Sequence, residues 1–150
     1  MPQVQVIAPL RAQEPAKIKV CAYARVSSDS ADQLNSFASQ VRYYTNLISG
    51  NENWTLVDIY ADRGITGTST AKRTEFQRMM EDCRKGKIDR ILVKSLSRFA
   101  RNTQDCIAAL RELRQLGVTV VFEKEHINTG TMANEMLISM MSAFAQEEAV

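Results

Sequence analysis

The chain has 150 residues, of which 45% are hydrophobic and 24% are charged, and its formal net charge is +2. These values are typical of a folded domain and exclude disordered, collagen-like and coiled-coil classes, while the length suits one domain with a sizeable core. No apolar stretch is long enough to span a membrane, and the N-terminus lacks the features of a signal peptide. We therefore expect a cytoplasmic protein with no membrane partner.

The prolines divide the chain into an arm and a domain. Pro2, Pro9 and Pro15 are all of its prolines, and none follows in the rest of the sequence. We therefore expect an N-terminal arm over 1–16 and one domain over 17–150.

Beyond the arm, strand and helix patterns alternate. Short apolar runs predict strands over 18–24, 54–61, 91–93 and 118–122. Apolar residues at helical spacing predict helices over 32–47, 76–83 and 106–116, and a last helix from about 132 to 150. The first helix is expected to turn Phe37, Tyr44 and Ile48 to one apolar face, and Gly86 and Gly117 to end the next two helices in a left-handed conformation. A polar, glycine-bearing loop is expected over 62–70.

This alternation favours an α/β fold with a mainly parallel sheet of about four strands or more, covered by helices. Ligands of such sheets bind at the carboxyl ends of the strands. The chemistry is therefore expected just after Ala24, Ala61, Val93 and Phe122.

The cysteines and the histidine restrict metal chemistry. Cys21, Cys83 and Cys106 are far apart and form no Cys-x-x-Cys pair, and His126 is the single histidine. We expect no metal site, three buried reduced thiols, and a solvated His126 in a loop over 124–130.

Basic residues gather around the third predicted strand. Residues 84–101 hold seven lysines and arginines against one aspartate, a local charge of +6 that leaves the remaining chain at −4, since the total is +2. This polarity predicts a polyanionic partner. A solvated helix end explains Arg84, Lys85 and Lys87 equally well. If the segment after Lys94 opens a helix, Arg98 and Arg101 lie on one of its faces, beside amides that also favour anions.

A serine follows the first strand. Arg25 and Ser27 are two residues apart, so in an extended segment they face the same way. A serine nucleophile normally needs a histidine base, which this chain does not readily supply. Phosphoryl transfer suits such a site, because arginines stabilise the charge that its transition state spreads over oxygens.

Three motifs, in this order, resemble the catalytic domain of the serine recombinases. They are Tyr23-Ala24-Arg25-Val26-Ser27, the loop from Tyr60 to Ser69, and the segment from Lys94 to Asn102. Residues 140–148 resemble the start of the long dimerisation helix of that family. The long first helix and the loop Gly64-Ile65-Thr66-Gly67 look closest to the large serine recombinases of phages and transposons.

The resemblance implies roles for individual residues. Ser27 matches the nucleophile that attacks a DNA phosphodiester and forms a 5′-phosphoseryl link. The arginines expected around that phosphate are Arg25, Arg73, Arg98 and Arg101, with Lys94, Arg98 and Arg101 contacting DNA. Supporting positions are Gln40, Asp62 and Ser97; the last stands where many members have an aspartate. Gln40 and Asp62 are equally compatible with bonds to neighbouring backbone.

The resemblance also implies DNA as partner, a homodimer that becomes a tetramer for strand exchange in a longer parent protein, and no cofactor. We expect this chain to be a catalytic fragment, with a truncated dimerisation helix at about 132–150. Two other functions stay open: a phosphate- or nucleotide-binding regulatory module of similar fold, and a structural dimerisation domain. The first lacks a glycine-rich phosphate loop, and the second leaves the arginines unexplained.

Overall fold

The computed structural model describes residues 17–27, 30–64, 73–100 and 102–131, with the single positions 139 and 142. The strands are β1 (Ile18–Ser27), β2 (Trp54–Gly64), β3 (Arg90–Val93), β4 (Thr119–Phe122) and β5 (Ile127–Asn128). The helices are α2 (Ser30–Ser49), α3 (Thr74–Arg84), α4 (Leu96–Phe99) and α5 (Thr103–Gln115), followed by the 3-10 turn η1 (Thr129–Thr131). The predicted arm, most of the predicted loop over 62–70, and the predicted last helix, apart from positions 139 and 142, lie outside the described residues.

The strands form one sheet in the order β2-β1-β3-β4-β5. β1 pairs in parallel with β2 and β3, β3 pairs in parallel with β4, and only β5 is antiparallel. The expected α/β fold with a mainly parallel sheet is confirmed. The parallel strands bring the ends of β1, β2, β3 and β4 to one edge of the sheet.

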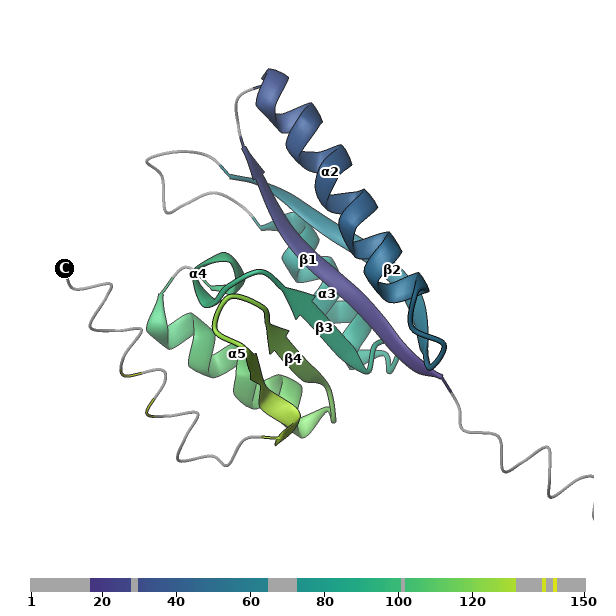
Figure 1. Cartoon of the computed structure of the whole chain (residues 1–150). Coiled ribbons are helices and arrows are strands. Elements are labelled where there is room, and N and C mark those ends of the chain that lie inside the picture. The colour runs from purple at the N-terminus through teal and green to yellow at the C-terminus, as the bar shows by residue number, and fades with distance from the viewer. Residues whose placement is uncertain are drawn as a thin grey trace, which may run out of the picture.

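Helices cover both faces of the sheet (Figure 1). Alternate residues of β1 point to opposite faces: Val20 and Ala22 join Tyr44 and Ile48 of α2 in one core cluster, whereas Cys21 and Tyr23 belong to the other. That second cluster includes Phe76, Met79, Met80 and Cys83 of α3, and Cys106, Leu110 and Leu113 of α5. The apolar faces predicted for α3 and α5 are therefore confirmed as core.

The two helix-ending glycines have the expected conformation. Gly86 and Gly117 have φ angles of 77° and 78°. After α5, the amide of Gly117 donates to Arg114 O and that of Val118 donates to Leu113 O, which satisfies carbonyls left open at the helix end. The three cysteines are buried and free, as predicted.

Other expectations were wrong in detail. Residues 124–130 hold β5 and the start of η1, because a tight turn with His126 at φ 56° returns the chain against β4. His126 itself is exposed, as expected. Phe37 is 45% exposed and Leu116 39% exposed, since the buried described residues of α2 are Tyr44 and Ile48 and α5 ends before Leu116.

Candidate active site at the carboxyl edge of the sheet

The first two of the three motifs extend strands further than the sequence predicted. β1 runs to Ser27 and β2 to Gly64, so the expectation that the loop begins at residue 62 was wrong. In this longer ladder Arg25 is in register with Asp62, and Ser27 with Gly64. The backbone of Ser27 thus lies at the carboxyl edge, beside the end of β2. Its side chain is outside the described part of the structure.

The carbonyl group of Arg25 joins three predicted site residues. Arg98 Nη1 donates a hydrogen bond to Arg25 O over 3.1 Å, and Gln40 Nε2 donates to the same oxygen over 3.4 Å. Gln40 comes from α2 and Arg98 from α4. The two side chains therefore meet at the strand that carries Ser27, two residues before it. One of the two interpretations of Gln40, a bond to backbone, is thus observed.

Arg73 is held at the start of α3 by three neighbours. Its guanidinium donates to the carbonyl of Phe99 and, over 3.3 Å, to the Tyr23 hydroxyl. Its central carbon lies 3.8 Å from the ring centroid of Phe76, in a cation–π arrangement. These contacts fix Arg73 beside the residue that follows Arg98.

Asp62 is a buried carboxylate that organises this region. It accepts the Tyr23 hydroxyl over 2.7 Å and the backbone amides of Glu75 and Phe76 over 2.9 and 3.0 Å. Asp62 therefore caps the N-terminus of α3 from a neighbouring strand, which is the backbone-bonding alternative that the sequence left open.

Tyr23 belongs to this network as a hydrogen-bond donor. Burial raises the pKa of its hydroxyl well above the usual range; the bond to Asp62 raises the pKa further, and the charge of Arg73 lowers it in part. A hydroxyl that keeps its proton at neutral pH is a poor nucleophile, so Tyr23 serves packing and positioning.

The helix expected after Lys94 is only one turn long. α4 ends at Phe99, and Ala100 and Asn102 both have extended backbones. The expected helical face shared by Arg98 and Arg101 was therefore wrong, because the segment leaves the helical conformation between them. Arg101 lies outside the described residues.

The basic segment is also divided in space. Arg84 forms ion pairs with Glu81 and Glu112, and Arg90 is the first residue of β3, at the amino edge. Lys94 and Arg98 lie at the opposite, carboxyl edge. The local charge of +6 thus does not form one surface, because β3 separates its two halves.

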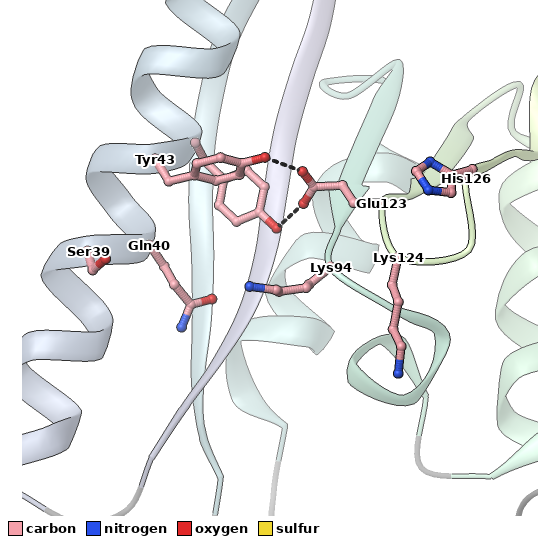
Figure 2. Close-up of a pocket in the computed structure, with 8 residues that line it drawn as sticks. Ser39, Gln40, Tyr43, Lys94, Glu123, Lys124 and His126 are labelled. Atoms are coloured by element: carbon pink, nitrogen blue, oxygen red, sulfur yellow. Dashed lines mark hydrogen bonds between the residues drawn. The ribbon is translucent and has the colours of Figure 1, made fainter.

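Ser97 and Lys94 take different places. The Ser97 hydroxyl lies 3.1 Å from that of Ser95, and Ser97 is exposed. Lys94 is exposed and lines a cavity of about 560 Å³ between α2 and the ends of β3 and β4. Figure 2 shows Lys94 extending toward Gln40.

The cavity contains residues that the sequence analysis did not assign. Tyr43 and Tyr44 of α2 donate hydrogen bonds to the two carboxylate oxygens of Glu123, over 2.5 and 2.7 Å (Figure 2). Lys124 and His126 also line it. Their position in the sequence could have identified two of them, because Glu123 and Lys124 directly follow Phe122, one of the four strand ends at which chemistry was expected.

The described residues contain no group of three or more histidine, cysteine, aspartate or glutamate side chains placed to hold a metal ion. Within the same residues, no helix has the length and hydropathy that crossing a membrane requires.

Residues 20–150 match the protein family described as "Resolvase, N terminal domain". The chain belongs to this family. A crystal structure of a resolvase family site-specific recombinase from Streptococcus pneumoniae is 34% identical and covers 89% of each chain, with a TM-score of 0.69. The catalytic domain of TP901-1 integrase has a TM-score of 0.62 at 23% identity, over 87% of this chain and 96% of that one, and so shares the fold.

Curated resolvases are similar over part of their length. The Tn21 resolvase of Escherichia coli is 36% identical over 100 residues, which cover 62% of this chain and 52% of that protein. The Tn552 resolvase of Staphylococcus aureus is 29% identical over 84% of this chain and 57% of its own length. The chain thus spans about half of each. The resemblance to the serine recombinase catalytic domain is confirmed, and the regulatory-module alternative is not favoured.

Proposed function

We propose that this resolvase-family chain is the catalytic part of a site-specific recombinase that cleaves and rejoins DNA through a phosphoserine intermediate. The observation that carries the proposal is the meeting of Arg98 and Gln40 at the carbonyl of Arg25, two residues before Ser27 in the same strand. This arrangement supports a phosphate site at the sheet edge, with Ser27 as its nucleophile. We also propose that it acts on DNA in the cytoplasm.

In the proposed reaction the Ser27 hydroxyl oxygen attacks the scissile phosphorus and loses its proton. The bond from phosphorus to the 3′ oxygen breaks, and that oxygen leaves as a hydroxyl after taking up a proton. The 5′ phosphate stays on Ser27 as a diester. Attack by a 3′ hydroxyl reverses the step and releases the serine, so the energy of the broken bond is kept.

The arginines have a shared part in this chemistry. The negative charge on the phosphate oxygens is stabilised by guanidinium groups that are already in place before the reaction. We assign this part to Arg25, Arg73, Arg98 and Arg101, and contact with the DNA backbone to Lys94, Arg98 and Arg101. Arg73 and Arg98 are each anchored on a backbone carbonyl, so their guanidinium groups are partly oriented in advance.

Supporting roles fall to three further residues. Gln40 positions the end of β1, Asp62 positions Tyr23 and α3, and Ser97 takes the place of an acid beside Arg98. We further propose that residues 1–16 form an arm, that 17–150 form the catalytic domain, and that a helix from about 132 begins the dimer contact, with a tetramer exchanging strands in the parent protein.

The deciding experiment is Ser27→Ala in the full-length parent protein, mixed with end-labelled DNA that carries its recombination site. We expect the covalent protein–DNA adduct and the cleavage product to disappear while the affinity for DNA stays within a factor of two or so. Ser49→Ala, at the exposed end of α2, is the matched control and keeps the adduct. An adduct formed by Ser27→Ala would refute the nucleophile assignment.

A further inference from the structure

The cavity between α2 and the ends of β3 and β4 is lined by two lysines and one acid. Glu123, the one acid among its lining residues, directs both carboxylate oxygens to Tyr43 and Tyr44 on α2. Among the described residues, the salt bridges include neither Lys94 nor Lys124. The lining residues thus carry a net positive charge that is open to an anion.

The backbone holds these two lysines side by side. The amide of Lys124 donates to Lys94 O over 2.8 Å, which continues the parallel pairing of β3 and β4 beyond the strands. Both side chains are exposed. In Figure 2 both lie below the carboxylate of Glu123; Lys94 extends toward Gln40, and Lys124 points away from Glu123 in another direction.

The cavity adjoins the site around Arg25. Gln40 lines the cavity and also bonds the Arg25 carbonyl. The charge of Arg98 is close enough to Tyr44 to lower the pKa of that hydroxyl, although burial and the bond to Glu123 raise it more. A ligand that reaches from Arg98 into the cavity therefore meets positive charge along its path.

We propose that this cavity is a subsite for a second backbone phosphate of the DNA strand, bound by Lys94 and Lys124 next to the phosphate attacked by Ser27. The inference rests on the proposed function. The cavity volume of about 560 Å³ falls within the range of about 300 to 1,000 Å³ typical of small-ligand pockets, so a phosphate enters with its sugar. Tyr43, which is 52% exposed, offers a ring edge to that sugar.

Glu123 has a positioning role in this subsite. Its bonds to Tyr43 and Tyr44 join α2 to the end of β4, and among the described residues it forms no ion pair with either lysine. Glu125, the next acid along the chain, accepts the amide of Leu96 over 3.2 Å and so is also occupied at the start of α4.

The test measures how the affinity of the 150-residue chain for a short DNA duplex depends on salt. Each phosphate that a protein neutralises adds about 0.9 to the slope of log K against log salt concentration. We expect Lys124→Gln to reduce the slope by about 1, and Arg98→Gln to do the same through the neighbouring phosphate. Lys87→Gln, an exposed lysine at the opposite edge of the sheet, is the control with the same charge change and keeps the slope.

The outcomes separate this inference from the proposed function. Equal slopes for Lys124→Gln and Lys87→Gln, with a reduced slope for Arg98→Gln, overturn the subsite alone. Unchanged slopes for both Lys124→Gln and Arg98→Gln mean that DNA does not use this edge, which overturns both proposals.

A second measurement locates the phosphate in the full-length parent protein bound to its own site. Neutral methylphosphonate linkages replace, one at a time, the phosphates that flank the scissile one. We expect one linkage to weaken binding of the natural protein by several-fold and to weaken binding of Lys124→Gln less, because only Lys94 still contacts that phosphate. If every linkage weakens both proteins equally, Lys124 has no phosphate partner and the subsite is refuted.

Discussion

The hydroxyl of Tyr23 donates a hydrogen bond to Asp62 Oδ2 over 2.7 Å, and the same carboxylate accepts the backbone amides of Glu75 and Phe76. One buried acid thus ties together β1, β2 and the first turn of α3. Arg73, the residue before α3, also donates to the Tyr23 hydroxyl. The position of a proposed catalytic arginine therefore depends on a carboxylate that acts through its neighbours.

Replacing Asp62 by alanine should destabilise the fold. The change leaves a buried hydroxyl and two helix amides without their acceptor, and an unsatisfied buried polar group costs about 1 to 3 kcal/mol. Urea unfolding of the chain measures this loss. Asp58→Ala is the matched control on β2, because its ion pair with Arg78 is about half exposed and such pairs contribute about 0 to 1 kcal/mol. Equal losses for the two variants would show that Asp62 does not organise the site.

Arg98 should affect the chemical step more than the fold. Removing one preorganised stabilising group typically lowers kcat by about 10²- to 10³-fold, so Arg98→Ala in the parent protein is expected to slow cleavage by that factor. Arg98→Lys should recover only part of the rate, because lysine keeps the charge but lacks the planar pair of donors. Single-turnover cleavage of labelled DNA gives both rates, and Arg111→Ala, on the exposed surface of α5, should cleave at the natural rate. A normal rate for Arg98→Ala would remove Arg98 from the site.

The sequence was sufficient to predict the parallel strands and the helices that bury regular apolar faces, such as α3 with Phe76, Met79 and Cys83. The two-residue strand β5 was missed because its pairing depends on a turn at His126 and not on any periodic pattern. The break between Arg98 and Arg101 was also missed. No proline or glycine marks it, and the chain becomes extended at Ala100 because Phe99 is packed into the core and Asn102 caps α5.

Within the site, the sequence identified the residues next to the strand ends but not the contacts between them. The bonds of Arg98 and Gln40 to Arg25 O, and the pairing of Tyr44 with Glu123, join positions distant in the chain. Such contacts depend on how α2 and α4 pack on the sheet. They leave no local signature in the amino-acid order.

Tyr44 should make stability sensitive to alkaline pH. Burial, followed by the bond to Glu123, raises the pKa of Tyr44 in the folded chain far above the value of about 10 for an unfolded tyrosine. The unfolded chain therefore loses this proton first, so the stabilisation is complete below about pH 10 and falls as pH rises beyond it.

Tyr44→Phe should lower the free energy of unfolding at pH 8 by about 1 kcal/mol, through loss of one hydrogen bond, and should make the decline above pH 10 less steep. Urea unfolding at pH 8, 10 and 11 tests both effects. The control is Tyr43→Phe, which removes the other phenol from Glu123 at a position 52% exposed, where we expect a smaller change in the alkaline decline. An unchanged decline in Tyr44→Phe would contradict the assignment.

Gly117 offers a test of how α5 is ended before β4. Its φ of 78° is a conformation that costs an L-residue about 1 to 2 kcal/mol, and a Cβ atom built there meets nothing within 4 Å. Gly117→Ala should therefore destabilise the chain by about that amount through backbone strain alone. Gly117→Asn should lose less, because asparagine tolerates this region better than alanine. Urea unfolding gives the free energy of unfolding of both variants. A more stable Gly117→Ala would mean that alanine fits this position without strain and only restricts the unfolded chain, which would refute the left-handed ending of α5.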